Sequence, residues 1–296
     1  MTSAWVFPGQ GSQKVGMVAD LIDHPLGAER FALAAELLGR DLAAICRGEA
    51  SGLLSDLDDT RNTQPALFLV EATLVDLLRQ QGRRAELLAG HSLGELVALY
   101  AAGCFDFATG LALVRQRSEL MAAVGDGAMT AVMGFDRAEL ESLVAASDAV
   151  VIANDNSRTQ VVISGSPAAV ARVGKSLRCR RAIPLAVSGA FHSPWMAEPA
   201  AAFAATLATI TFAAPETPVI SNASASATAD AAALKANLTR QMTTPVRWRE
   251  TMDRIAAAGI DTVVEIGPGT VLSGLFKRST PGVGLSQIGS VAALGL

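Results

Sequence analysis

Short apolar runs bounded by glycine alternate with longer stretches of helical periodicity along most of the chain. One apolar run spans residues 4–7, and another spans residues 86–89, directly after a helical stretch from about Gln64 that ends at Gly82. A third run, at 262–267, precedes a helical stretch near the C-terminus. Strands that alternate with helices in this way form a parallel sheet covered by helices. The pattern therefore predicts an α/β fold with a parallel central sheet.

The pattern changes over residues 127–188, where the strands are closer together. The predicted order is strand, helix, strand, strand, helix, strand, at residues 128–134, 136–147, 149–154, 160–165, 166–177 and 181–187. Asp136 and Ser166 are well suited to cap the two helices. The order βαββαβ is that of a ferredoxin-like unit. We therefore expect a main domain of residues 1–126 and 189–296, into which this subdomain is inserted.

Composition and charge exclude several classes of protein. Half of the 296 residues are hydrophobic, which is ample for a large core, and the net charge of −4 lacks the basic footprint of a nucleic-acid-binding protein. No stretch reaches the roughly 20 strongly apolar residues of a membrane span, and no secretory signal precedes the first strand. Cys46, Cys104 and Cys179 are scattered, which favours reduced thiols over a disulfide or a metal site. We therefore expect a cytoplasmic monomer with no metal ion and with neither nucleic acid nor membrane as a partner.

The stretch Gly90-His91-Ser92-Leu93-Gly94 stands between a predicted strand and a predicted helix. This context is that of a nucleophile elbow, in which a strained turn projects the serine hydroxyl from the edge of the sheet. The next amide, Leu93 N–H, lies at a helix N-terminus, where it can stabilise an oxyanion. The alternative is a glycine turn of structural importance only. We favour Ser92 as a nucleophile.

A serine nucleophile needs a base, and the chain contains three histidines. His91 is the neighbour of Ser92, and successive side chains point apart, so we expect it to brace the turn. His24 precedes Pro25 in a predicted surface loop. His192 follows the last strand of the predicted insert, where the chain returns to the main domain and where a cleft between domains is expected. By elimination, His192 is the predicted base.

A catalytic triad would require an acid between Ser92 and His192, as in α/β-hydrolases. Asp148 and Asp155 are candidates, but neither follows a predicted strand of the main sheet. A backbone carbonyl can instead orient a histidine through its other ring nitrogen. We therefore predict a Ser–His dyad.

Six short motifs occur in order and span nearly the entire chain: FPGQGSQ, GHSLGE, RQRSELM, GAFHS, PVRW and EIGPG. Together they resemble the malonyl-CoA:acyl carrier protein transacylases of fatty-acid synthesis. The resemblance implies an α/β-hydrolase-like main domain with an inserted ferredoxin-like subdomain. It also implies an acyltransferase that moves a malonyl group from coenzyme A to the phosphopantetheine thiol of acyl carrier protein through a malonyl-serine intermediate. The partners would be malonyl-CoA and acyl carrier protein, and no cofactor would be needed.

The resemblance also implies roles for individual residues. Ser92 would be acylated, with His192 as its base. The backbone amide of Gln10 would be the second donor of the oxyanion hole, because the glycines around it in PGQGSQ let the backbone approach an acyl group closely. Arg117 would bind the free carboxylate of malonyl, and a main-chain carbonyl near Arg247 would orient His192.

The sequence itself leaves an alternative for Arg117. It lies in an otherwise apolar helical stretch, where a guanidinium offers a fork that matches a carboxylate in two hydrogen bonds. It could equally be a surface arginine paired with Glu119 or Asp126. For the pocket, Phe191 beside the predicted base resembles the malonyl-selecting form of GAFHS and favours malonyl over methylmalonyl.

A basic run leads into the last predicted strand of the insert and comprises Lys175, Arg178, Arg180 and Arg181. It is suited to dock an acidic carrier protein, with Arg180 and Arg181 as the docking residues, or to bind the phosphates of coenzyme A. The alternative is a solvated helix end, where cations suit the helix dipole.

Other functions remain open from the sequence. A serine esterase or thioesterase would use the same elbow with water as the acyl acceptor. The chain could also be an acyltransferase subunit of a polyketide or malonate-metabolising system, or a carrier-binding protein without activity.

Overall fold

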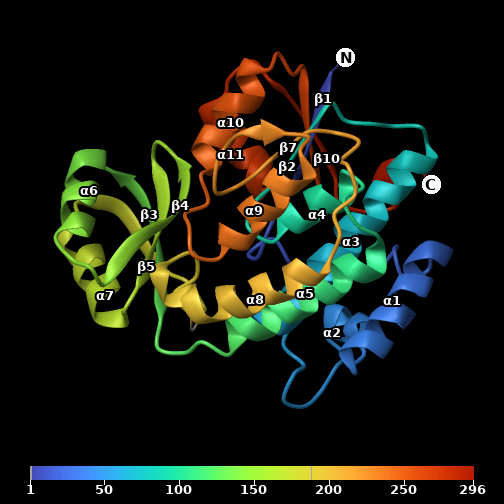
Figure 1. The fold of residues 1–296 in the computed structure, drawn as a ribbon, viewed down its shortest axis with the longest axis horizontal. Coiled ribbons are helices and arrows are strands. Elements are labelled where there is room, and N and C mark those ends of the chain that lie inside the picture. Colours follow the sequence, from blue (N-terminus) through green and yellow to red (C-terminus); the bar gives the residue numbers. More distant parts are fainter. Residues whose placement is uncertain (1, 188) are drawn as a thin grey trace.

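The computed structural model describes residues 2–187 and 189–296 and shows two sheets in separate lobes (Figure 1). The larger sheet has the strand order β10-β9-β1-β2-β7-β8. Its strands are β1 (Ser3–Phe7), β2 (Leu87–Gly90), β7 (Val219–Ile220), β8 (Ala227–Thr228), β9 (Thr262–Ile266) and β10 (Gly284–Ile288). Every pairing in it is parallel except that between β7 and β8. The prediction of an α/β fold with a parallel central sheet is confirmed.

The central strand β1 is buried on both faces, which explains why its sequence is an uninterrupted apolar run. Successive side chains of a strand point to opposite faces. Trp5 and Phe7 therefore enter the larger core, while Ala4 and Val6 enter a second core on the other side of the sheet.

Helices cover both faces of the large sheet. Those on the side of Trp5 and Phe7 are α1 (Pro25–Leu38), α2 (Leu42–Arg47), α3 (Thr60–Gln80), α4 (Gly94–Ala101), α5 (Phe107–Ala122), α8 (Ala197–Thr209) and α9 (Ala231–Gln241). On the other side lie α10 (Trp248–Ala257) and α11 (Val271–Ser279). Two short 3₁₀ helices, η1 (Pro194–Met196) and η2 (Ala292–Leu294), complete the described elements.

Helix α3 begins earlier than the sequence pattern predicted. Asp59 caps it by accepting a hydrogen bond from the Arg61 amide at 2.9 Å, so Pro65 lies inside the helix instead of at its start. A proline has no N–H to donate to the carbonyl four residues back. That carbonyl, of Arg61, accepts a hydrogen bond from Arg40 Nη2 at 2.6 Å instead.

The smaller sheet takes all its strands from the predicted insert and has the order β4-β5-β3-β6, with every pairing antiparallel. Its elements are β3 (Ala128–Phe135), α6 (Arg137–Ala145), β4 (Val150–Ser157), β5 (Gln160–Gly165), α7 (Pro167–Ser176) and β6 (Cys179–Pro184). The two helices pack on one face and share a separate hydrophobic core with the sheet. The element order agrees with the prediction, although the last strand begins and ends a few residues earlier than expected.

Strand β4 fastens the smaller lobe to the larger one. Asn154 forms a parallel bridge with Val246, and the carboxylate of Asp155 pairs with Arg249 at 2.9 Å. The side chain of Asn156 reaches His91 in the elbow. The elbow is therefore in direct contact with both lobes. None of the described helices is both long and apolar enough to cross a membrane.

Candidate active site

The GHSLG turn has the backbone of a strained elbow. Ser92 lies between β2 and α4 with a positive φ of 54°, which is unfavourable for any residue with a side chain. A Cβ on Gly90 would lie 1.9 Å from the Gly94 carbonyl, and one on Gly94 would lie 2.1 Å from the Phe7 carbonyl. Both glycines are therefore required for the turn to close against β1 and α4.

The structure brings Ser92 and His192 together, as the elimination among the three histidines predicted. His192 Nε2 lies 2.7 Å from Ser92 Oγ, and His192 is only 3% exposed. The other two histidines have local roles. His91 Nε2 contacts Asn156 Oδ1 at 2.8 Å and so braces the turn, while His24 caps α1 by accepting from the Leu26 amide.

The carbonyl that orients His192 belongs to Gln241, at 3.0 Å from Nδ1, so the expectation for Arg247 was wrong. The carbonyl of Arg247 is engaged in the first turn of α10, where it accepts from both the amide and the hydroxyl of Thr251. Asp155 is held by Arg137 and Arg249 and does not contact the imidazole. The geometry is that of a Ser–His dyad with a backbone carbonyl as the third group.

His192 is held in the form that a general base requires. Burial, and then the positive charge of Arg117, lower the pKa of His192 to about 3, so the imidazole is neutral at physiological pH. A neutral ring has one N–H, and the Gln241 carbonyl can only accept it from Nδ1. The lone pair therefore lies on Nε2, facing the Ser92 hydroxyl.

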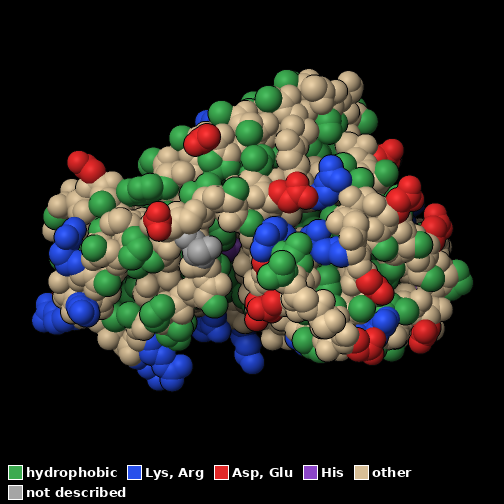
Figure 2. All heavy atoms as spheres, turned by 90° about the horizontal axis from the view of Figure 1, so that it is seen from below, with side chains coloured by type: hydrophobic (Ala, Val, Ile, Leu, Met, Phe, Trp, Pro, Cys, Tyr) green, Lys and Arg blue, Asp and Glu red, His purple; other side chains and the backbone are tan. Residues whose placement is uncertain are grey.

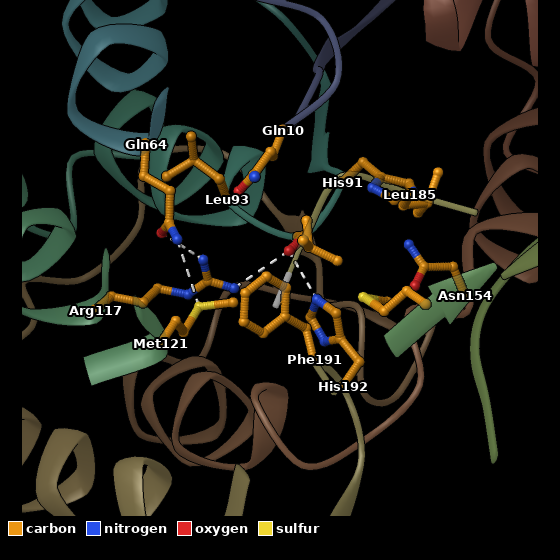
Figure 3. A pocket seen from close by; sticks show the side chains of 13 residues that line it. Gln10, Gln64, His91, Leu93, Arg117, Met121, Asn154, Leu185, Phe191 and His192 are labelled. Carbon is orange, nitrogen blue, oxygen red and sulfur yellow. Dashed lines mark hydrogen bonds between the residues drawn. The ribbon is translucent and has the colours of Figure 1, made fainter. Parts of the chain in front are cut away.

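Arg117 lies inside the site rather than on the surface, so the surface pairing with Glu119 or Asp126 is wrong. It is 1% exposed, and its Nη1 donates to Gln64 Oε1 at 2.6 Å. Its Nη2 lies 2.9 Å from Gln241 Oε1 and 3.2 Å from Ser92 Oγ. Arg117 and His192 reach the serine oxygen from different sides (Figure 3). Burial lowers the pKa of Arg117 to about 10, which leaves the guanidinium charged at neutral pH.

The two predicted oxyanion donors lie at the same edge of the sheet. The parallel register pairs Phe7 with Gly90, so the loop after β1 and the elbow after β2 leave the sheet side by side. A Cβ on Gly9 would lie 2.4 Å from the His91 carbonyl, which shows how closely the two loops pack. Gln10 and Leu93 both line the cavity in front of Ser92, and neither amide donates to an acceptor within the described residues.

The cavity has a volume of about 90 Å³. Its polar lining is formed by the residues described above, and its apolar lining is formed by Met121, Met129, Leu185, Val187 and Phe191. It lies in the groove between the lobes, and a histidine side chain is visible there from outside (Figure 2). A small acyl group with one charged end suits this combination of polar and apolar lining.

Two residues that the sequence did not single out hold the elbow in place. Asn222 Oδ1 accepts from the Ser92 amide at 2.7 Å, and its Nδ2 donates to the Gly90 carbonyl at 2.6 Å. Gln241 contributes its carbonyl to His192, and its side chain contacts Arg117 and the Ser92 carbonyl. Neither lies in a recognisable pattern, because Asn222 is in a serine-rich loop and Gln241 ends an ordinary amphipathic helix.

Arg180 and Arg181 lie apart from this cavity, on the exposed edge strand β6. Together with Arg278 of α11 they line a separate hollow of about 580 Å³ that shares no lining residue with the active-site cavity. Several basic side chains gather along the lower rim of the smaller lobe (Figure 2). An edge strand also carries charges to prevent pairing with another sheet, so this position has a second physical explanation.

Comparison with known proteins agrees with the geometry. Residues 4–286 match the acyl transferase domain family. The chain is 49% identical to the malonyl CoA-acyl carrier protein transacylase of Synechocystis sp. over 98% of both chains. The crystal structure of a Synechocystis malonyl-CoA:ACP transacylase superposes with a TM-score of 0.96 at 48% identity, covering 100% of this chain and 99% of that one. A malonyl-transacylase in complex with its type II PKS acyl-carrier protein has a TM-score of 0.92 at 38% identity over 99% of this chain and 98% of that one. The chain belongs to the acyl transferase family, and these similar proteins are malonyl-CoA:acyl carrier protein transacylases.

Proposed function

We propose that this chain transfers a malonyl group from coenzyme A to the phosphopantetheine thiol of acyl carrier protein, as a step of fatty-acid synthesis. One observation carries the proposal: a single hydroxyl, Ser92 Oγ, lies within hydrogen-bonding distance of both a neutral imidazole and a buried guanidinium. The first suits a base and the second suits the carboxylate of a malonyl group.

In the first step, Ser92 Oγ attacks the thioester carbonyl of malonyl-CoA while His192 Nε2 takes the hydroxyl proton. The oxyanion of the tetrahedral intermediate accepts hydrogen bonds from the amides of Gln10 and Leu93. The C–S bond then breaks, and His192 returns the proton to the sulfur of coenzyme A. The product is malonyl-Ser92 and a free thiol.

In the second step, the phosphopantetheine thiol gives its proton to His192 and attacks the malonyl ester. The same two amides stabilise the second oxyanion, and Ser92 Oγ leaves with the proton from His192. Both steps balance in atoms and protons with malonyl-CoA and the carrier as substrates, so the scheme needs neither a cofactor nor a metal ion.

Arg117 is the proposed contact of the malonyl carboxylate. Its Nη2 lies 3.2 Å from Ser92 Oγ, so the guanidinium faces the position that an acyl group on the serine would occupy. Phe191 lies in the apolar lining beside the dyad and would crowd an α-methyl branch. We therefore propose malonyl rather than methylmalonyl as the preferred acyl group.

A serine esterase or thioesterase is the alternative, because it would share the first step and use water in the second. Incubation with malonyl-CoA followed by intact-protein mass spectrometry separates the two. We expect a malonyl adduct on the native chain, none on Ser92→Ala, and rapid discharge by holo-carrier or pantetheine thiol but not by water. Discharge in buffer alone, with no thiol product, would identify a thioesterase.

The partners and the architecture follow from the same proposal. We propose that Arg180 and Arg181 dock the acidic carrier, since neither is paired with a carboxylate within the described residues and Arg278 adds a third charge beside them.

We also propose an α/β-hydrolase-like main domain of residues 1–126 and 189–296 with a ferredoxin-like subdomain at 127–188. The element order of the smaller lobe supports that division. A cytoplasmic monomer remains our expectation.

A further inference from the structure

Glu95, in the first turn of α4, is a buried acid directly behind the nucleophile. Its side chain is fully shielded from solvent. Its Oε2 accepts a hydrogen bond from Gln241 Nε2 at 2.7 Å and another from the Asn222 amide at 3.1 Å. Burial raises the pKa of Glu95 above its usual value, while the hydrogen bonds from Gln241 and Asn222 and the positive charge of Arg117 oppose that shift by favouring the ionised form. Glu95 therefore places an acidic group in the interior, three residues after the serine, where a positive charge favours its ionised form.

Arg117 is the nearest charge of opposite sign, yet the two do not touch. The guanidinium donates to the side-chain oxygens of Gln64 and Gln241, and within residues 2–187 and 189–296 no carboxylate forms an ion pair with it. The side-chain amide of Gln241 lies between the two charges. Its NH₂ group faces Glu95 and its oxygen faces Arg117, so the amide dipole is aligned favourably with both.

We propose that Glu95 is a positioning residue for substrate selection: it neutralises Arg117 through the Gln241 amide and thereby holds the guanidinium charged, oriented and open to the malonyl carboxylate. This inference rests on the proposed function. A carboxylate in direct contact with Arg117 would satisfy the guanidinium and compete with the substrate. A carboxylate one amide away compensates the buried cation and leaves the substrate side of it free.

The arrangement has a physical reason in the cost of burying charge. A guanidinium buried without a counter-charge is strongly destabilised, and removing one partner of a buried pair leaves that cost on the other. Gln241 cannot supply the charge itself, but it can transmit orientation, because its amide has only one direction that suits both neighbours. The main-chain carbonyl of Gln241 also orients His192. A displaced Gln241 side chain would therefore impair the selection of malonyl first and the function of His192 as a base second.

The test compares two substrates on Glu95→Gln, which keeps the shape and the acceptor of the side chain but removes its charge. The rate of acyl-enzyme formation is measured by quenched intact mass with malonyl-CoA and with acetyl-CoA, which has no carboxylate. We expect kcat/KM for malonyl-CoA to fall about tenfold or more, mainly through KM, and that for acetyl-CoA to change less than about threefold. Glu71→Gln is the matched control, since Glu71 is also a fully buried acid but accepts no hydrogen bond from Gln241 or any other group within the described residues, and it should leave the ratio of the two rates unchanged.

Equal losses with both substrates would overturn the proposal, because Glu95 would then act only as a scaffold for the elbow. An unchanged kcat/KM for both substrates would overturn it as well. The double variant Glu95→Gln/Arg117→Ala gives an independent test, since the Glu95 substitution should have no further effect on malonyl transfer once Arg117 is gone. If Glu95→Gln folds poorly, the double variant should melt at a higher temperature than the single one, and a double variant no more stable would contradict the charge relation. Failure of the proposed function itself is distinguishable, since the native chain would then form no malonyl adduct.

Discussion

The guanidinium of Arg117 lies 3.2 Å from the hydroxyl oxygen of Ser92. The group that recognises the charged end of the substrate is therefore in contact with the nucleophile. A malonyl group is short enough for its carboxylate and its thioester carbonyl to occupy the two positions at once. The same proximity places a positive charge near His192, which contributes to keeping that imidazole neutral.

Replacing Arg117 by alanine should erode the preference for malonyl over acetyl groups. Loss of the charged contact should raise the activation free energy by about 2–5 kcal/mol. We expect this to appear as a lower kcat/KM for malonyl-CoA. Acyl-enzyme formation with each thioester measures it. Arg115→Ala is the control, because Arg115 lies on the same helix but donates to the Leu37 carbonyl outside the site. Unchanged discrimination in Arg117→Ala would remove this residue from carboxylate binding.

Replacing Gly9 by alanine should damage the oxyanion hole without touching the dyad. The new Cβ would lie 2.4 Å from the His91 carbonyl, so the loop that carries the Gln10 amide must move. Loss of one such donor lowers kcat by about 100- to 1,000-fold. Steady-state transfer rates measure the effect. Gly174→Ala, in helix α7 with open space around it, should leave the rate unaltered, and a Gly9→Ala enzyme of normal kcat would argue against Gln10 as a donor.

His192 should make the stability of the protein sensitive to mild acid. Its pKa is about 3 in the folded state and 6.5 in an unperturbed histidine, so the unfolded chain takes up a proton that the folded chain does not. Stability is complete above pH 6.5 and is lost as the pH falls from there towards 3. Between pH 7 and pH 5 the loss is on the order of 2 kcal/mol. Urea unfolding at both pH values, in the native chain and in His192→Gln, should show this extra loss in the native chain alone.

Reversing the charges of Arg180 and Arg181 should weaken binding of the carrier protein and leave the reaction with malonyl-CoA unchanged. In Arg180→Glu/Arg181→Glu we expect KM for the carrier to rise about tenfold, with a smaller effect at high salt, because exposed charges act mainly on association. The rate of acylation by malonyl-CoA should be unchanged. Arg172→Glu, on the exposed face of α7 and outside the hollow, is the control. A rise in KM for malonyl-CoA instead would assign the arginines to the phosphates of coenzyme A.

Local patterns in the sequence were sufficient for the central strands and the elbow. Strands β1 and β2 are buried on both faces and therefore read as continuous apolar runs. The spacing of Gly90 and Gly94 around Ser92 marks the turn, because any Cβ at either position would collide with backbone. The choice of His192 required only that the chain has three histidines and that two of them have positions unsuited to a base.

The sequence pattern was less reliable where a residue has an exceptional neighbour. Helix α3 was expected to start near Pro65, because proline normally belongs to the first turn. Its true start depends on the Asp59 cap and on Arg40, which satisfies the carbonyl that Pro65 leaves free. Arg40 comes from outside the helix, and no periodicity within the helix reveals it.

By itself, the sequence determined the α/β alternation, the inserted run of elements, the elbow with its serine and the histidine that serves it, since each depends on neighbours along the chain or on a count of residues. Only the tertiary structure decided that Gln241 rather than Arg247 faces the imidazole, that Asn222 clamps the elbow and that the Gln241 side chain lies between Glu95 and Arg117. These are contacts between segments far apart in the chain. Their partners are selected by how the strands and helices pack, and a hydrogen-bonding side chain carries no local mark of the distant atom that it will meet.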